Sequence, residues 1–352
     1  MLWSVESTAY PVFLIIGAAT LPYVAHARHI KPEVLKAMHN GAMAEFQLKV
    51  LDDVGTPVSN ASVCAVFDIL PEPHTIYGKT DTNGMCIAKG RTNGNYIEFL
   101  SGKDGYYGAQ KKITLIEMNA EHDVKDDKWL PYGVTEVLLL RRIHKPVALH
   151  SFGFGAGRVV PVTNTWIGVD MAYGDFIKPY GKGEHVDFEV MVEWDGRPPI
   201  DSNYCVANMR FVEQLSGGYY APIIRESEYP YVYGANENDS YDVRHVKVTC
   251  RGNARQGEAC QLGNGAVLVT RTRCVLDGNG NLKSACYGFI RMFDADASWE
   301  GKPTMRLAGV FNPTHNDTNL EDVETAKRAR HSIRKCEPPP QSEKKRKSFW
   351  PF

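Results

Sequence analysis

The 352-residue sequence lacks the local motifs of several common enzyme classes. It contains no Gly-x-Ser-x-Gly elbow and no His-Glu-x-x-His motif, so two frequent hydrolase signatures are missing. No two of its eight cysteines are spaced as Cys-x-x-Cys, which argues against a zinc ribbon or a thioredoxin-type site. In the glycine-rich stretch 153–158, Arg158 stands where a dinucleotide fingerprint would place its third glycine. These absences predict no enzymatic activity and no cofactor.

Long apolar runs are also scarce. The run PVFLIIGAATL at residues 11–21 has the length of a signal-peptide apolar region and is too short to span a bilayer. Ala25, His26 and Ala27 follow in small-x-small order, which predicts a signal peptide over residues 1–27. A buried first helix is the alternative, because Glu6 rather than a basic residue precedes the run. The expected location is secreted, periplasmic or at the cell surface, with no membrane span after signal removal.

An exported chain can keep disulfides, and the cysteine positions suggest three pairs. The candidate pairs are Cys64 with Cys86, Cys250 with Cys260, and Cys274 with Cys286. In the hairpin sequence CVLDGNGNLKSAC, the last pair is symmetric about Gly280, which would set the two residues opposite each other. Cys205 and Cys336 are left over. Buried free thiols remain the alternative for each pair.

The first half of the chain reads as a series of short strands. After a lead-in segment at residues 28–44, apolar residues recur with a period of two. The predicted strands lie at 45–51, 61–68, 75–79, 85–88, 95–100, 107–115 and 135–142. Seven short strands within about 100 residues are typical of an immunoglobulin-like (Ig-like) β-sandwich, here over residues 45–143.

The second half is also β-rich. In residues 185–194, Phe188, Val190 and Val192 share one face with Val186 and Trp194, and acidic residues alternate with them. Further strands are predicted at 165–171, 204–211, 244–251, 266–276, 285–293 and 304–310. The predicted fold class is therefore all-β: an Ig-like β-sandwich followed by a second, larger β-sandwich at residues 146–318. Residues 319–352 are predicted to form a polar helix and a basic, disordered tail.

Two resemblances add to this interpretation. The stretches VLDDVGTPVSNASV, GKTDTNGM and KDGYYG, at residues 50–63, 78–85 and 103–108, resemble carboxypeptidase-regulatory-like or bacterial Ig-like modules. They cover about a quarter of the chain and imply a β-sandwich in an exported protein. Residues 170–190 and 311–322 are similar to segments of uncharacterised secreted proteins of Lentisphaerae- and Verrucomicrobia-type bacteria. That second resemblance implies no activity and transfers no functional residue.

The Tyr-rich segment 217–241 is the best candidate for a binding surface. Tyr229, Tyr231 and Tyr233 recur with a period of two, so a strand would present all three on one face. Exposed tyrosines provide amphipathic contact area, which suits sugar or protein recognition. Three tyrosines that face the core would explain the same spacing, and this alternative stays open.

Three aspartates in the second half suggest a different function, that of a hydrolase. Asp170, Asp175 and Asp187 surround the sequence YGDFIKPYGKG. Paired carboxylates about 5 to 9 Å apart carry out acid–base chemistry in glycosidases. Turn capping and solvated strand positions would also explain these three residues.

The favoured function is that of an exported, non-catalytic protein of surface structure or interaction, with a glycan or cell-surface protein as partner. The alternatives are a carbohydrate-binding module that uses residues 217–241 and a hydrolase that acts on a polysaccharide. No nucleic-acid partner is expected, because the basic charges before the C-terminal SFWPF are few and no aromatic residue is interleaved among them.

Overall fold

A computed structural model of the protein describes residues 31–338, except 68–73, 95, 116–123, 195–203, 238–239, 252–253, 258–261, 263–264, 298–301 and 334–335. The predicted signal peptide at residues 1–27 lies outside the described residues, as does most of the predicted tail. The described part consists mainly of strands in antiparallel sheets, which confirms the all-β fold class. Two helices are present in it, α1 (Pro32–Asn40) and α2 (Val323–Ile333).

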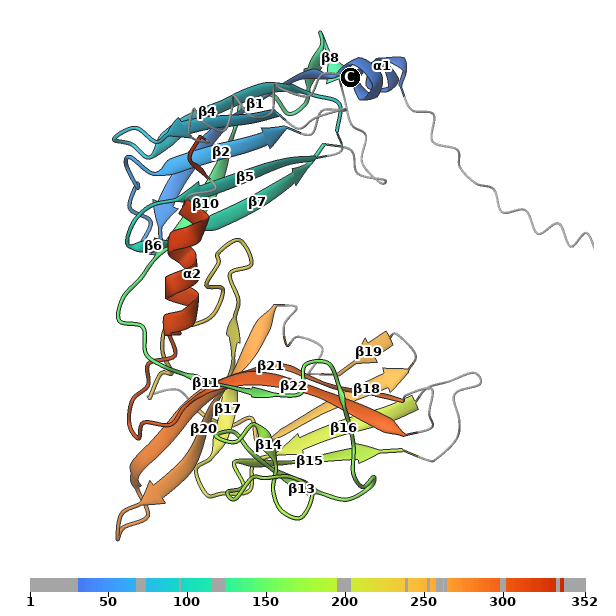
Figure 1. Ribbon diagram of the computed structural model, residues 1–352, viewed down its shortest axis with the longest axis vertical. Helices are drawn as coiled ribbons and strands as arrows, with labels where there is room; N and C mark the ends of the chain where they lie inside the picture. The colour runs from blue at the N-terminus through green and yellow to red at the C-terminus, as the bar shows by residue number, and fades with distance from the viewer. Residues whose placement is uncertain are drawn as a thin grey trace, which may run out of the picture.

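Two sheets make the first domain (Figure 1). One has the order β6-β10-β1-β9-β8, with β4 also paired to β1, and the other has the order β3-β2-β5-β7. Their bounds are β1 (Ala42–Asp52), β2 (Ser62–Phe67), β3 (His74–Lys79), β4 (Met85–Thr92), β5 (Tyr96–Gly102), β6 (Tyr106–Tyr107), β7 (Ala109–Thr114), β8 (Val124–Lys125), β9 (Lys128–Trp129) and β10 (Val134–Arg142). Alternate residues of β1, including Phe46, Leu48 and Val50, pack against Phe67 and Phe99 of the facing sheet. The core of this domain therefore lies between the two sheets.

The second domain also contains two sheets, of orders β11-β22-β21-β20-β17 and β14-β13-β15-β16-β18-β19, with β12 paired to β22. Their bounds are β11 (His150–Gly153), β12 (Arg158–Val159), β13 (Ile167–Asp170), β14 (Asp175–Phe176), β15 (Phe188–Glu193), β16 (Tyr204–Arg210), β17 (Gly217–Pro222), β18 (His245–Arg251), β19 (Ala254–Gln256), β20 (Ala266–Leu276), β21 (Leu282–Ala297) and β22 (Pro303–Asn312). As the alternation predicts, Phe188, Val190 and Val192 are buried between the sheets.

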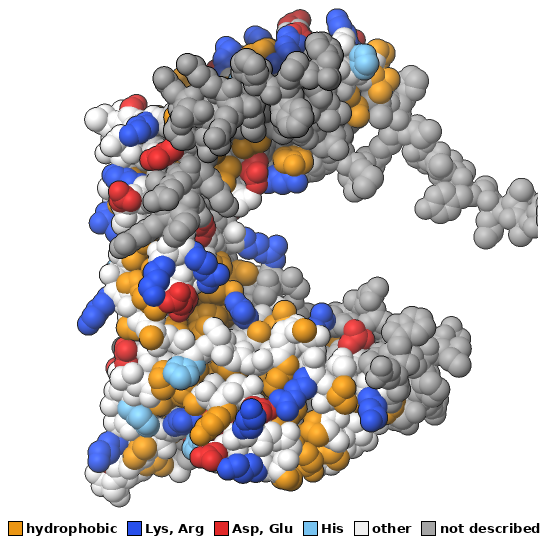
Figure 2. Space-filling view, in the orientation of Figure 1, with side chains coloured by type: hydrophobic (Ala, Val, Ile, Leu, Met, Phe, Trp, Pro, Cys, Tyr) orange, Lys and Arg blue, Asp and Glu red, His pale blue; other side chains and the backbone are white. Residues whose placement is uncertain are grey.

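The chain returns from the second domain to the first through α2. Asp322 begins this helix, because its Oδ2 accepts a hydrogen bond from the Thr325 N–H at 2.9 Å. The helix contacts β5 and β6 of the first domain. Figure 2 shows that the two domains meet along one side, where α2 lies, and diverge on the other.

The predicted pairing of Cys64 with Cys86 is wrong. Cys64 lies on β2 and Cys86 on β4, and these strands belong to different sheets. Cys86 packs against the core between the sheets, whereas Cys64 does not belong to that core. The two thiols therefore lie on opposite sides of the β3-β2-β5-β7 sheet, and sequence alternation alone could not show which face each one took.

The pairing of Cys274 with Cys286 is also wrong. The hairpin turn runs from Asp277 to Asn281, so its centre falls one residue before Gly280, and Cys286 lies opposite Thr272. A bulge follows Thr272 and shifts the register again. Cys286 consequently packs between the two sheets, while Cys274 packs on the other face of its sheet.

The third predicted pair is Cys250 with Cys260. Cys260 lies outside the described residues. Cys250 on β18 stands directly opposite Cys205 on β16, which the sequence-based pairing had left over. The cross-strand neighbour of Cys250 is thus a residue that loop spacing did not identify.

Candidate functional site

The predicted row of tyrosines is not an open surface. Tyr229, Tyr231 and Tyr233 lie in a series of bends after β17 rather than in a strand, and Tyr229 is only 1% exposed. Its ring stacks on Tyr233, with 5.8 Å between centroids, and lies edge-on to Tyr231 at 5.9 Å. The strand that would present all three on one face is not formed, because the chain turns repeatedly, and the rings pack over one another, as in the packing alternative that the spacing left open.

These rings form part of the contact between the two domains, which also includes backbone hydrogen bonds from Gln110 to Glu226 and from Glu228 to Gly108. Tyr107 of the first domain stacks on Tyr229 with 5.0 Å between ring centroids. The Tyr107 hydroxyl donates a hydrogen bond to the buried carboxylate of Glu321 at 2.9 Å. That carboxylate also accepts from the N–H groups of His144 and Lys145, at 3.0 and 2.9 Å. Burial is the main cause of a raised pKa for Tyr107, and the hydrogen bond to Glu321 raises this pKa further.

Arg141 also belongs to this contact. Its side chain is buried and donates hydrogen bonds to the carbonyl oxygens of Tyr229, at 2.6 Å, and of Tyr231. Its guanidinium lies 4.1 Å from the ring centre of Tyr233, within cation–π range. We call the set Tyr107, Arg141, Tyr229, Tyr231, Tyr233 and Glu321 the tyrosine junction. Sequence reasoning missed Arg141 and Glu321, since local patterns give no sign that a charged residue is buried.

The three aspartates divide between two arginines. Asp170 and Asp187 are almost fully buried, and both bind Arg273, with its Nη2 2.8 Å from Asp170 Oδ1 and its Nε 2.9 Å from Asp187 Oδ1. Asp175 is separate and pairs with Arg158. Asp170 also accepts hydrogen bonds from four backbone N–H groups, those of Ala172, Tyr173, Glu184 and His185.

The environment of Asp170 favours its charged form. Burial alone would raise its pKa, but the backbone N–H groups and the Arg273 guanidinium together lower it below the ordinary value. A glycosidase general acid needs the opposite shift, toward a raised pKa. The geometry therefore gives Asp170 a structural role, as the acceptor that fixes the surrounding turns around Arg273.

We expect Asp170 to make stability depend on pH in acid. Because its pKa is lower in the folded state than the ordinary 3.8, the ionised group stabilises the fold above that value. This contribution is lost as the pH falls through the lower folded-state pKa. Urea unfolding of the wild type and of Asp170→Asn, from neutral pH to about pH 2, should show a free-energy gap that shrinks in acid. The exposed Asp104→Asn serves as control, and a gap for Asp170→Asn that stayed constant would contradict the prediction.

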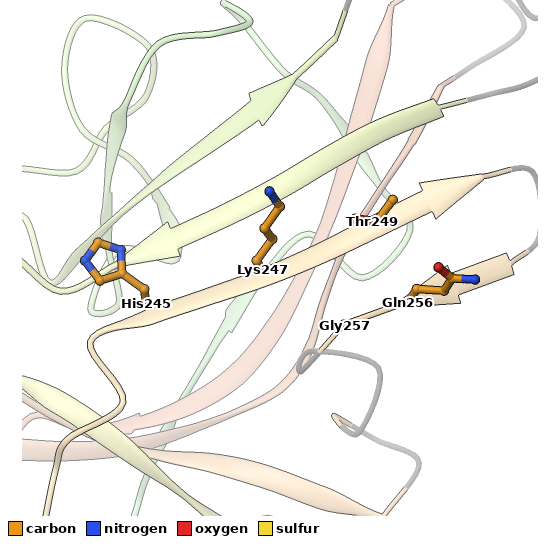
Figure 3. A pocket seen from close by; sticks show the side chains of 5 residues that line it. All are labelled: His245, Lys247, Thr249, Gln256 and Gly257. Atoms are coloured by element: carbon orange, nitrogen blue, oxygen red, sulfur yellow. The ribbon is translucent and has the colours of Figure 1, made fainter.

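An open groove lies on the solvent face of the second domain (Figure 3). Its volume is about 350 Å³, and among the described residues it is lined by His245, Lys247 and Thr249 of β18 with Gln256 and Gly257. The three β18 side chains alternate with buried residues of the core and so point to the same side. Gly257 has a φ of +115°, and a Cβ there would lie 2.6 Å from the Lys247 carbonyl oxygen. A glycine is thus needed for the chain to pass this close to β18.

The face beside the groove carries an aromatic ring and more polar groups. Arg210 stands opposite His245 on the adjacent strand, and its guanidinium lies 4.1 Å from the ring centre of Trp166. Arg210 also pairs with Glu189 at 2.6 Å. Lys247 is exposed, and within the described ranges no carboxylate pairs with it. The predicted strand at 244–251 already placed these β18 residues two apart, and that was the one sequence signal for the groove.

No three His, Cys, Asp or Glu residues of the described set gather as a metal site. Neither described helix is long and apolar enough to cross a membrane.

Comparison with known proteins gives only distant likenesses. No protein-family model matches the sequence, and no curated protein matches it. A DUF3823 family protein from Parabacteroides merdae is 7% identical over 77% of this chain and 99% of its own, with a TM-score of 0.21. The 3-chlorocatechol 1,2-dioxygenase from Rhodococcus opacus is 12% identical over 29% of this chain, with a TM-score of 0.23. The match spans 61% of that dioxygenase, less than two thirds of its length. At these TM-scores the likenesses carry no functional argument.

Proposed function

We propose that this chain is an exported, non-catalytic interaction protein that binds an acidic glycan along the β18 groove. The observation that carries the proposal is the line of His245, Lys247 and Thr249 on the solvent face of one strand. Side chains two residues apart on a strand lie roughly 7 Å from each other. Three hydrogen-bonding groups in such a row fit an extended, polar ligand that lies along the strand.

The chemistry of the groove supports an acidic sugar. A volume of about 350 Å³ is at the small end of ligand sites, and it accommodates part of a chain rather than a whole folded partner. Lys247 offers an ammonium group to a carboxylate or sulfate, and charge-assisted hydrogen bonds are the stronger ones. Trp166 immediately precedes β13 of the same sheet, and its ring lies against Arg210, so an aromatic group stands beside these polar groups.

The remaining parts of the chain support the export and structural side of the proposal. The apolar run at residues 11–21 and the small residues up to Ala27 form the expected leader. The residues of the tyrosine junction come from both domains, and their contacts hold the second domain against the first. In this proposal the first domain supports the second, and the second domain carries the binding surface.

A glycan array tests the proposal directly. The secreted protein, whose N-terminal sequence should begin at Arg28, is expected to bind carboxylated or sulfated glycans. Lys247→Ala should weaken binding about tenfold, because one charge-assisted hydrogen bond is worth roughly 1.5 kcal/mol. Binding by the wild type should also weaken as salt is raised.

Lys283→Ala is the matched control, because it removes an exposed lysine from the same domain at the start of β21, outside the groove lining. It should leave the affinity unchanged. Equal losses in the two variants would mean that general positive charge, and not the groove, attracts the ligand. A blank array would overturn the glycan proposal.

A further inference from the structure

Cys64 points away from the core of the first domain and is nevertheless buried. Its neighbours on β2, Val63 and Ala65, belong to the core between the two sheets. Side chains alternate along a strand, so Cys64 faces outward. An outward residue of a two-sheet domain normally contacts water, yet Cys64 is only 2% exposed. Another segment therefore covers this position on the outer face of the sheet.

The C-terminal segment provides that cover. The helix α2 contacts β5, which is the neighbour of β2 in the sheet, and Cys336 follows three residues after the helix ends at Ile333. Cys336 is also 2% exposed. Its thiol and that of Cys64 are hydrogen-bonded to each other. Two cysteines far apart in the sequence thus meet on one face of the first domain.

We propose that Cys64 and Cys336 form a disulfide that fastens the C-terminal segment to the outer face of the first domain. The covalent loop would enclose the whole second domain. A cross-link between residues so distant restricts the unfolded chain more than a short loop does. It would also act beside the tyrosine junction, so that the two domains are joined by packing and by a covalent bond.

The bond forms by exchange with an oxidising disulfide, either a small molecule or an oxidoreductase. The hydrogen bond from Cys336 lowers the pKa of Cys64, which favours Cys64 as the attacking thiolate. Its attack forms a mixed disulfide and releases one thiolate of the oxidant. Cys336 then attacks the Cys64 sulfur and releases the second. In total the two protein thiols lose two protons and two electrons, and the disulfide of the oxidant is reduced to two thiols.

In the cell this reaction rests on the export proposed above, because cytosolic thiols are kept reduced. The purified protein tests the pairing independently of export. We would refold the chain in a mixture of reduced and oxidised glutathione, alkylate the free thiols and digest with trypsin without reduction. Trypsin places Cys64 in the peptide 50–79 and Cys336 in the peptide 336–344. These two peptides are expected to be recovered as one linked species that separates on reduction.

In Cys336→Ser, the peptide 50–79 should instead carry the alkylating group. Cys86→Ser is the matched control and should keep the link, because Cys86 lies on the inner side of the sheet. Alkylation of both Cys64 and Cys336 in the refolded wild type would overturn the proposal, as would a link from Cys64 to Cys86. A link present in purified protein and absent from protein recovered from cells would count against export and leave the pairing supported.

Discussion

Replacing Arg273 by methionine is expected to destabilise the protein by about 3–5 kcal/mol. The variant would leave the carboxylates of Asp170 and Asp187 buried without their shared cation, and those side chains are 1% and 0% exposed. An uncompensated buried charge costs more than the ion pair itself contributes. Urea unfolding at neutral pH should show a lower midpoint with an unchanged slope.

The backbone conformation at Arg273 is a second reason to expect a large loss of stability from Arg273→Met. The residue has a φ of +52° at the bulge of β20, a conformation that few non-glycine residues adopt. The bulge displaces the side chain from the regular alternation of the strand, and both carboxylates bind it there. The ion cluster and the bulge therefore stabilise each other. Loss of the guanidinium removes the cation that holds the two carboxylates at the bulge.

Two further variants separate charge from packing. Combining Arg273→Met with Asp170→Asn and Asp187→Asn removes the unpaired charges and should recover part of the lost stability. Lys178→Met breaks the exposed pair with Glu184, whose side chains are 68% and 59% exposed, and should cost far less stability than Arg273→Met because solvent screens the pair. If Arg273→Met cost no more than Lys178→Met, the buried cluster would not stabilise the fold.

The sequence predicted most of the longer strands, because the signal for a strand is local, but β11 and β17 were not predicted. In residues 185–194, apolar and polar residues alternate, which implies only that one face of the strand is buried. Phe188, Val190 and Val192 are buried as expected. The turn at DGNGN has an equally local cause. Asp277 Oδ1 accepts hydrogen bonds from the N–H groups of Asn279 and Asn281, at 2.8 and 2.9 Å, which closes the hairpin without help from the rest of the chain.

The cysteine partners were not predictable, because they depend on register and on distant segments. A turn centred one residue earlier than expected and a bulge at Arg273 separate Cys274 from Cys286. Cys64 meets Cys336 only because α2 returns to the first domain. Spacing between nearby cysteines carries no information about either event.

One side of the candidate groove could be predicted from the sequence, and the other could not. A strand at 244–251 implies that His245, Lys247 and Thr249 share a face, and the structure confirms this. The opposite wall depends on β19 and on the positive φ of Gly257, which brings the chain back beside Lys247. That approach results from tertiary packing, and glycine alone in a sequence does not predict it.

Replacing Tyr229 by alanine is expected to separate the two domains while each stays folded. Tyr229 is fully buried, stacks on Tyr107 of the first domain and contacts Tyr231 and Tyr233 of the second. Loss of a buried aromatic side chain of this size costs about 3–5 kcal/mol. Because the ring belongs to neither sandwich core, the cost should fall on the contact between the domains. Calorimetry should then resolve two thermal transitions where the wild type is expected to show one, and small-angle scattering should give a larger radius of gyration.

Tyr173→Ala is the matched control, because Tyr173 lies in the second domain and is 57% exposed. It should leave the single transition and the radius of gyration unchanged. A single transition shifted to lower temperature in Tyr229→Ala would mean that the two domains unfold as one unit even without the ring. In that case the remaining contacts, among them Arg141, Glu321, the helix α2 and the backbone hydrogen bonds of Gly108 and Gln110, would be sufficient to couple the domains. The tyrosine stack would then contribute stability without deciding whether the domains separate.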